Sequence, residues 1–142
     1  MEIRLIKYRS EDYFKSVELR DKILRKPLGM VFSENFLKQD KDDYIFGLFE
    51  QNRIRAVLHL KPLSDTVLKM RQVAVDENLQ GKGYGSKLVR YSETFARNNG
   101  YSEIILHARD TAVTFYEKLN YRKIGKPFTE IGILHVKMGK TL

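Results

Sequence analysis

Several segments in the first half of the chain have the residue pattern of β-strands. Residues 2–5 alternate charged with apolar side chains, which predicts a short strand. Residues 44–49 and 54–60 are rich in apolar, β-branched and aromatic side chains, and the short polar stretch between them predicts a β-hairpin. Residues 67–75 form a third run of the same kind. These last three strands predict an antiparallel meander.

A helix is predicted to follow the first strand. Ser10 is a typical N-cap, and Glu11 and Asp12 place acidic side chains in the first turn of the helix. The helix should end near Pro27 and Gly29, because proline cannot continue a helix and glycine accepts the left-handed exit. The segment from there to about residue 43 is predicted to be irregular or briefly helical.

The second half of the chain alternates helical and strand-like patterns. Residues 88–96 have helical apolar spacing and are followed by a stop signal at Gly100. Residues 104–106 are an apolar run with little alternation, which predicts a strand covered on both faces. Strand, helix and strand in this order indicate a right-handed parallel crossover. A further helix should begin at Asp110 or Thr111, with apolar positions at Ala112, Phe115, Tyr116 and Leu119.

Two strand-like segments, residues 121–124 and 131–138, close the chain. There is no internal repeat, linker or sign of a second domain. The pattern therefore predicts one mixed α/β domain over residues 1–142, with a central, mostly antiparallel sheet that contains one parallel crossover.

Composition and charge limit the chemistry. The chain has 26 Lys plus Arg against 18 Asp plus Glu, a formal charge of +8, and no Cys. Thiolate nucleophiles, cysteine-type zinc sites and disulfides are therefore excluded. The positive surplus favours an anionic partner, such as nucleic acid, an anionic membrane surface or a polyphosphate cofactor. Because the basic residues are spread along the chain and do not cluster, nucleic acid is the less favoured of these partners.

Targeting signals are not evident in the sequence. The N-terminal residues alternate charged with apolar side chains and lack the apolar core of a secretory signal, so we expect a cytoplasmic protein. The longest uncharged stretch, residues 27–33, has seven residues, whereas a membrane-spanning helix needs about 20. No membrane association is expected.

A glycine-rich turn joins the strand at residues 67–75 to the next helix. Gly81, Gly83 and Gly85 let the backbone turn sharply, and the helix that follows adds unpaired N–H groups and the positive end of its dipole. Such a turn can hold a phosphate group, or it can be a tight turn without a ligand. It is not a P-loop, because Gly85 is followed by Ser86 and Lys87 in the wrong order. It also lacks the glycine spacing of a dinucleotide fold.

The segment Gln80-x-x-Gly83-x-Gly85 resembles the acyl-CoA pyrophosphate loop of the GNAT superfamily of N-acetyltransferases. The helix that carries Phe115 and Tyr116 resembles the next conserved helix of that family. The ending Gly132-Ile133-x-His135-x-x-Met138 resembles the ElaA and YjcF-like branch, as does the N-terminal segment with Arg20, Ile23, Leu24, Pro27, Leu28 and Gly29.

This resemblance implies a GNAT-like fold and a direct transfer of an acetyl group from acetyl-CoA to a primary amine. The fold would have about six to seven sheet strands and about four flanking helices. Tyr116 would be the general acid that protonates the leaving thiolate. Acetyl-CoA would be bound by backbone groups of Val73, Ala74 and Val75 and by the loop Gln80, Gly81, Lys82, Gly83, Tyr84, Gly85 and Ser86.

The sequence leaves three matters open. His59, His107 and His135 have the intrinsic chemistry of a general base, but so do glutamates or a chain of water molecules. The acceptor amine is not indicated, and a homodimer is only the default expectation. No metal site is expected, because the histidines and acidic residues show no ligand spacing. A non-catalytic acyl-CoA sensor and a basic nucleic-acid-binding domain remain the alternative functions.

Overall fold

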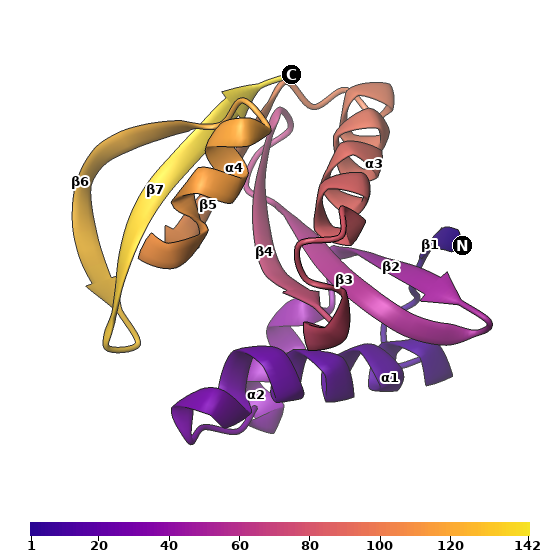
Figure 1. The fold of residues 1–142 in the computed structure, drawn as a ribbon. Coiled ribbons are helices and arrows are strands. Elements are labelled where there is room, and N and C mark those ends of the chain that lie inside the picture. The colour runs from indigo at the N-terminus through magenta and orange to yellow at the C-terminus, as the bar shows by residue number, and fades with distance from the viewer.

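The computed structural model describes residues 1–142 and contains one seven-stranded sheet in the order β1-β2-β3-β4-β5-β7-β6 (Figure 1). All neighbouring strands are antiparallel except β4 and β5, which are parallel. This arrangement confirms the predicted mixed α/β class, the three-stranded meander and the single parallel crossover. The strands are β1 (Glu2–Leu5), β2 (Tyr44–Glu50), β3 (Arg53–Pro62), β4 (Val67–Val75), β5 (Glu103–Arg109), β6 (Arg122–Glu130) and β7 (Ile133–Thr141).

The α-helices are α1 (Glu11–Arg20), α2 (Glu34–Leu37), α3 (Tyr84–Asn98) and α4 (Val113–Lys118). The Ser10 hydroxyl accepts a hydrogen bond from the Tyr13 amide, as its predicted N-cap role requires. After α1 the chain continues through a π-helical turn, Asp21–Arg25, and a short 3-10 turn, Lys26–Leu28. This helical segment ends at Gly29, the predicted stop, which has a left-handed conformation. None of these helices combines the length and the apolar character that a membrane-spanning helix requires.

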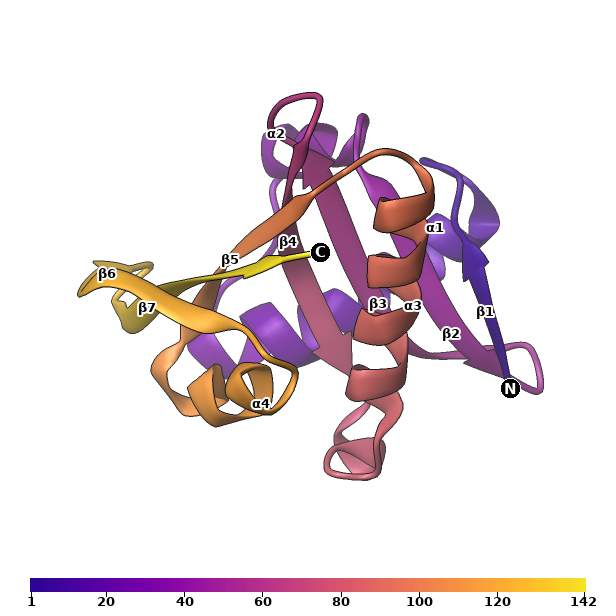
Figure 2. The ribbon, with the colours of Figure 1, turned by 90° about the horizontal axis from the view of Figure 1, so that it is seen from above.

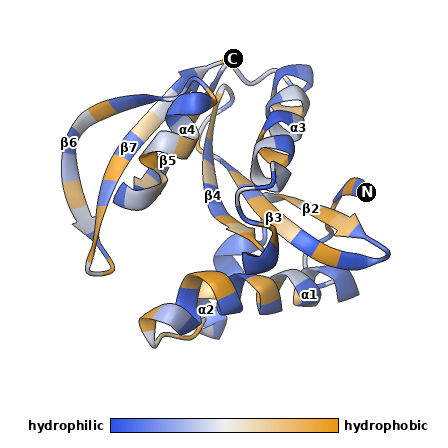
Figure 3. Ribbon diagram, viewed as in Figure 1, coloured by the Kyte–Doolittle hydropathy of each residue, from blue (hydrophilic) through white to orange (hydrophobic).

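Helices α1 and α3 cover opposite faces of strands β2 to β4 (Figures 1 and 2). Successive side chains of a strand point to opposite faces. Accordingly, Phe46 packs with Leu88 of α3 in the larger core, whereas Ile45 packs with Tyr13 of α1 in the smaller one. Figure 3 shows hydrophobic residues in these strands and hydrophilic residues at the turn between β2 and β3. Two cores therefore hold the sheet rigid from both sides.

Three details of the second half differ from the sequence prediction. Strand β5 alternates buried and half-buried residues. One face is fully covered, as predicted, but the prediction was wrong for the other face, which is only half-buried. Strand β6 extends to Glu130 beyond the predicted end at residue 124, because an edge strand tolerates Pro127 together with the register shift between Ile124 and Phe128. Ile131 was predicted in the last strand but lies in the β6–β7 turn with a left-handed φ of 48°.

The parallel strands β4 and β5 separate partway along their length. Their pairing ends at Met70 and Leu106, although β4 continues to Val75 and β5 to Arg109. At this point β4 contains a bulge, because His59 pairs with Arg71 while Val57 pairs with Ala74. Gln72 within the bulge has a left-handed φ of 55°. A bulge bends its strand, and the bend leaves an open wedge between the two strands.

Candidate active site

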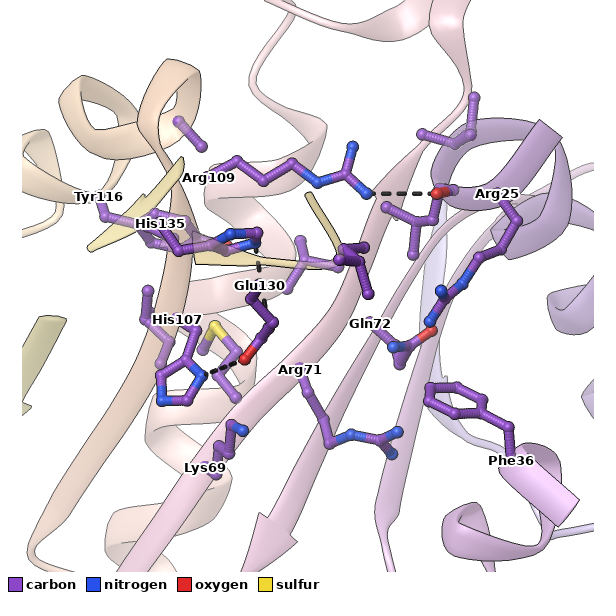
Figure 4. Close-up of a pocket in the computed structure, with 18 of the residues that line it drawn as sticks. Arg25, Phe36, Lys69, Arg71, Gln72, His107, Arg109, Tyr116, Glu130 and His135 are labelled. Carbon is purple, nitrogen blue, oxygen red and sulfur yellow. Dashed lines mark hydrogen bonds and ion pairs between the residues drawn. The ribbon is translucent and has the colours of Figure 1, made fainter. Parts of the chain in front are cut away.

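The wedge between β4 and β5 opens into a cavity of about 600 Å³ (Figure 4). One wall is the bulged end of β4, which includes Gln72 and Val73, and the opposite wall is the end of β5 with Arg109. Tyr116 of α4 and His135 of β7 reach the cavity from the β5 side. The half-buried His107 and Arg109 of β5 line this cavity, together with the buried Leu106 and Ala108 of the same strand. A space of this size suits a small molecule or part of a cofactor.

The predicted phosphate loop lies between β4 and α3. Gly83 is the N-cap of α3 with a left-handed φ of 87°, and no side chain caps the helix. The first helical hydrogen bond runs from the Lys87 amide to the Gly83 carbonyl, so the amides of the three preceding residues have no partner within the helix. A β-carbon added at Gly83 would meet no atom within 4 Å. The structure thus brings together open space, unpaired donors and the positive end of a 15-residue helix.

The remaining loop residues support this geometry. The Gln80 side-chain amide donates to the Val75 carbonyl over 3.1 Å, which ties the loop to the end of β4. The Tyr84 hydroxyl donates a hydrogen bond to Glu50 over 2.7 Å, and this bond raises the pKa of the Tyr84 phenol. At Gly85, an added β-carbon would lie 3.2 Å from the Phe115 ring. The glycine therefore allows α3 and α4 to approach each other beside the wedge.

The other predicted cofactor residues are distributed over the same region. Gln80 and Val73 line the cavity directly, whereas the Ala74 side chain is buried in the smaller core on the α1 side of the sheet. Ala74 can therefore contact a ligand only through its backbone. Gly81, Lys82 and Ser86 lie in the loop or in the first turn of α3, and the first two of these are exposed.

Tyr116 is buried in the larger core, with its side chain on the cavity lining. Burial raises the pKa of its phenol well above the ordinary value of 10. The hydroxyl therefore keeps its proton and can serve as a hydrogen-bond donor to an atom in the cavity. The Phe115 and Tyr121 rings pack against Tyr116 edge to face and fix its orientation.

Two of the three candidate histidines also face the cavity. His107 and His135 line it on either side of Glu130, which lies 3.1 Å from Nδ1 of His107 and 4.0 Å from Nε2 of His135 (Figure 4). The His135 Nδ1 lies 2.8 Å from the Ile133 carbonyl oxygen, which can only accept a hydrogen bond. Nδ1 therefore carries the proton in neutral His135, and Nε2 presents a lone pair. This arrangement makes His135 a candidate proton acceptor.

The third histidine, His59, belongs to a buried ionic network on the other side of β4. The network contains Arg20, Asp40 and His59, which are completely buried. Asp40 accepts hydrogen bonds from the Tyr13 hydroxyl at 2.7 Å, from Arg20 at 2.8 Å and from Arg71 at 3.1 Å. The Nε of Arg20 also donates to Gln72 in the β4 bulge, over 3.1 Å. The network thus supports the bulge that opens the cavity, and it was not predicted from the sequence.

The electrostatics of this network explain how the charges tolerate burial. Desolvation lowers the pKa of His59 to about 4, although the hydrogen bond to Asp43 opposes this effect. Burial would raise the pKa of Asp40, but His59, Arg20 and the donated hydrogen bonds hold it below its ordinary value. Asp40, Asp43 and His59 offer ligand atoms within 4.8 Å of one another, as a metal site would. Arg20 and Arg71 already balance the two carboxylates, so neutrality requires no ion.

Comparison with known proteins identifies the family. A family model described as an acetyltransferase (GNAT) domain matches residues 18–142. An uncharacterized acetyltransferase of Streptococcus pyogenes is 37% identical over 62 residues, which is 44% of this chain and 42% of that protein. The chain thus aligns with less than half the length of this relative.

Solved structures share the fold over nearly the whole chain. Escherichia coli ElaA matches with a TM-score of 0.83 and 16% identity, over 98% of both chains. A GNAT family acetyltransferase from Elizabethkingia anophelis with acetyl-CoA bound matches with a TM-score of 0.78 and 16% identity, over 99% of this chain and 97% of that one. The family match, supported by the wedge between β4 and β5 and by the glycine loop before α3, shows that the chain belongs to the GNAT acetyltransferase family.

Proposed function

We propose that the protein transfers an acetyl group from acetyl-CoA directly to a primary amine in a ternary complex. The observation that carries this proposal is the uncapped, glycine-opened N-terminus of α3 beside a cavity between separated parallel strands. Family membership supports it, and so does the Elizabethkingia anophelis neighbour with bound acetyl-CoA.

Cofactor binding would use backbone groups at both ends of the wedge. The amides of residues 83–86 would hold the pyrophosphate, with Lys82 adding positive charge. The pantetheine arm would follow residues 73–75 of β4, and an amide near Val75 would polarise the thioester carbonyl. One well-aimed donor of this kind stabilises a developing oxyanion by about 3 kcal/mol.

In the chemical step, the amine nitrogen would form a bond to the thioester carbonyl carbon, and the carbon–sulfur bond would break. The chain has no cysteine that could carry the acetyl group, which supports direct attack. The proton for the leaving CoA thiolate would come from the hydroxyl of Tyr116, a residue of the cavity wall whose phenol stays protonated because burial raises its pKa. As the carbon–sulfur bond breaks, the substrate nitrogen releases its extra proton, which returns through solvent to the Tyr116 oxygen and restores the phenol. The products are an N-acetylated amine and CoA with a free thiol.

The attacking amine must first lose a proton, because an alkylammonium has a pKa near 10.4. We assign this role to Nε2 of His135. This ring nitrogen is unprotonated in the neutral side chain, because Nδ1 carries the proton that is donated to the Ile133 carbonyl. Glu130, 4.0 Å from the same nitrogen, would stabilise the imidazolium that forms. His59 cannot act in this way, since it is buried in the ionic network away from the cavity lining.

Calorimetric titration with acetyl-CoA tests the proposal, with Gly83→Glu as the disabling variant. The glutamate would place a bulky anion in the phosphate loop, so we expect saturable micromolar binding by the wild type and no measurable binding by the variant. Gly100→Glu is the matched control. Gly100 has a φ of 85° against 87° at Gly83, and the same open surroundings, but it follows the opposite end of α3. Equal binding by Gly83→Glu and Gly100→Glu would refute the loop assignment.

A further inference from the structure

The cavity carries more positive charge than its own carboxylate can balance. Arg25, Lys69, Arg71 and Arg109 line it, whereas Glu130 is the only acidic residue on its wall. Two of these cations already interact with acidic residues. Arg71 donates to the buried Asp40 and Asp43, and Glu130 acts on the ammonium of Lys69 by raising its pKa against the effect of burial.

Arg25 and Arg109 have no carboxylate partner. The guanidinium of Arg25 lies over the rings of Phe32 and Phe36, 4.8 Å and 4.7 Å from their centres. Arg109 donates to the carbonyl of Leu24 over 3.2 Å, so its guanidinium is held next to the residue that precedes Arg25. Neither arginine forms a salt bridge in the structure.

Holding these groups together without an anion is unfavourable. Burial and the charges of Arg109, Arg20 and Arg71 lower the pKa of Arg25, as mutual repulsion between like charges requires. Guanidinium groups that are fixed by rings and by a backbone carbonyl are well suited to pair with a carboxylate, because their planar donors match its two oxygens. The geometry therefore describes a site suited to an anion, formed by the π turn after α1 and the end of β5.

This anion site lies within the same cavity as the candidate base. Figure 4 shows Arg25 and the guanidinium of Arg109 on one side of the cavity and His107 with Glu130 on the other. Most of the phosphate loop is a separate region, because Gln80 is its only residue that lines the cavity and residues 81–86 do not. One ligand that spans the cavity would place an anionic group at the arginines and a cationic group near Glu130.

We propose that the acceptor is a small amine that also carries a carboxylate, with this carboxylate bound by Arg25 and Arg109. The inference rests on the proposed function and specifies its substrate class. Glu130 would attract the ammonium end toward His135, while the two arginines hold the opposite end. The cavity of about 600 Å³ suits a small molecule, and the bound CoA arm would occupy part of it.

Matched amines that differ in one charge test this inference. We would measure thiol release from acetyl-CoA with 4-aminobutanoate, 4-aminobutanamide and 1,4-diaminobutane, and repeat the series with amino acids and their amides. The carboxylate-bearing amines should give a kcat/KM about 10-fold to 100-fold higher, since a hydrogen-bonded charge pair contributes that much to binding. Equal or better rates with the neutral or cationic amines would overturn the inference while leaving the acetyltransferase proposal intact.

Variants then assign the effect to the arginines. Arg25→Gln and Arg109→Gln should each remove most of the preference for carboxylates, mainly through KM, while the exposed control Arg53→Gln keeps it. Calorimetric affinity for CoA should change less than about twofold, because both residues lie away from the phosphate loop. A large loss of CoA affinity with unchanged acceptor preference would show that these arginines bind the cofactor and would refute the proposal. Absence of turnover with every amine would instead refute the proposed function itself.

Discussion

Replacing Asp40 by Asn should strongly destabilise the protein, because it leaves a buried arginine without its counter-ion. The side chains of Arg20 and Asp40 are both 0% exposed and lie 2.8 Å apart. Asp40 also accepts hydrogen bonds from Tyr13 and Arg71. An asparagine at this position removes the negative charge and turns an amide donor toward a site where every partner donates.

The expected magnitude follows from the burial of the pair. Removal of one partner of a buried ion pair costs about 3–5 kcal/mol, whereas domains of this size are stable by about 5–15 kcal/mol in total. Asp40→Asn should therefore lose about a fifth or more of the free energy of unfolding. The β4 bulge should also loosen, because Arg20 holds Gln72.

Urea unfolding at neutral pH, followed by circular dichroism, measures this loss directly. The control is Asp42→Asn, which makes the same chemical change two residues away at an exposed position and should cost less than about 0.5 kcal/mol. A second variant, Arg20→Met combined with Asp40→Asn, should be less destabilised than the sum of its single changes by about 1 kcal/mol or more. If Asp40→Asn instead lost less than about 1 kcal/mol, close to the small loss of the control, the buried ion pair would not stabilise the fold as proposed.

Three further predictions concern the proposed catalytic groups and the buried histidine. Tyr116→Phe should lower kcat by about 10²-fold to 10⁴-fold and leave calorimetric acetyl-CoA binding unchanged; unchanged kcat would remove the tyrosine from the mechanism. His135→Asn should lower kcat/KM most at neutral pH and recover at high pH, where the free amine forms unaided, whereas a pH-independent loss would indicate a structural role. The folded protein keeps His59 neutral down to about pH 4, whereas the unfolded chain protonates this residue below its ordinary pKa near 6.5. The unfolded state therefore binds more protons between these two pH values, and stability falls as the pH falls through this window. The loss between about pH 7.5 and about pH 4.5 should be about 2 to 3 kcal/mol, and urea titrations of His59→Asn should show a correspondingly smaller pH dependence.

The sequence predicted those parts of the fold that depend on local patterns. The apolar, β-branched and aromatic runs at residues 44–49 and 54–60 became β2 and β3, and Ser10 became the N-cap of α1. The glycine loop before α3 was also found, because glycines after a strand are a local signal with a clear physical meaning. Each of these features is specified by neighbouring residues.

Features that depend on distant contacts could not be predicted. Arg20 reaches Gln72 across 52 positions, and no spacing along the chain indicates such a pair. Gln72 adopts a left-handed backbone conformation that glutamine seldom has. The sequence therefore contains no signal for the bulge that separates β4 from β5. The proposed role of His135 depends on this separation, because the buried His135 side chain meets open space only where it lines the wedge.

Acetyl transfer itself is the central claim, and simultaneous quantification of both products tests it most directly. Purified protein would be mixed with acetyl-CoA and a panel of anionic, neutral and cationic primary amines, and free CoA thiol and N-acetylated amine would be measured together. Equal amounts of both products are expected with at least one amine, and no thiol release is expected without an amine. Tight binding of acetyl-CoA without thiol release for any amine would contradict the claim and identify the protein as an acyl-CoA sensor.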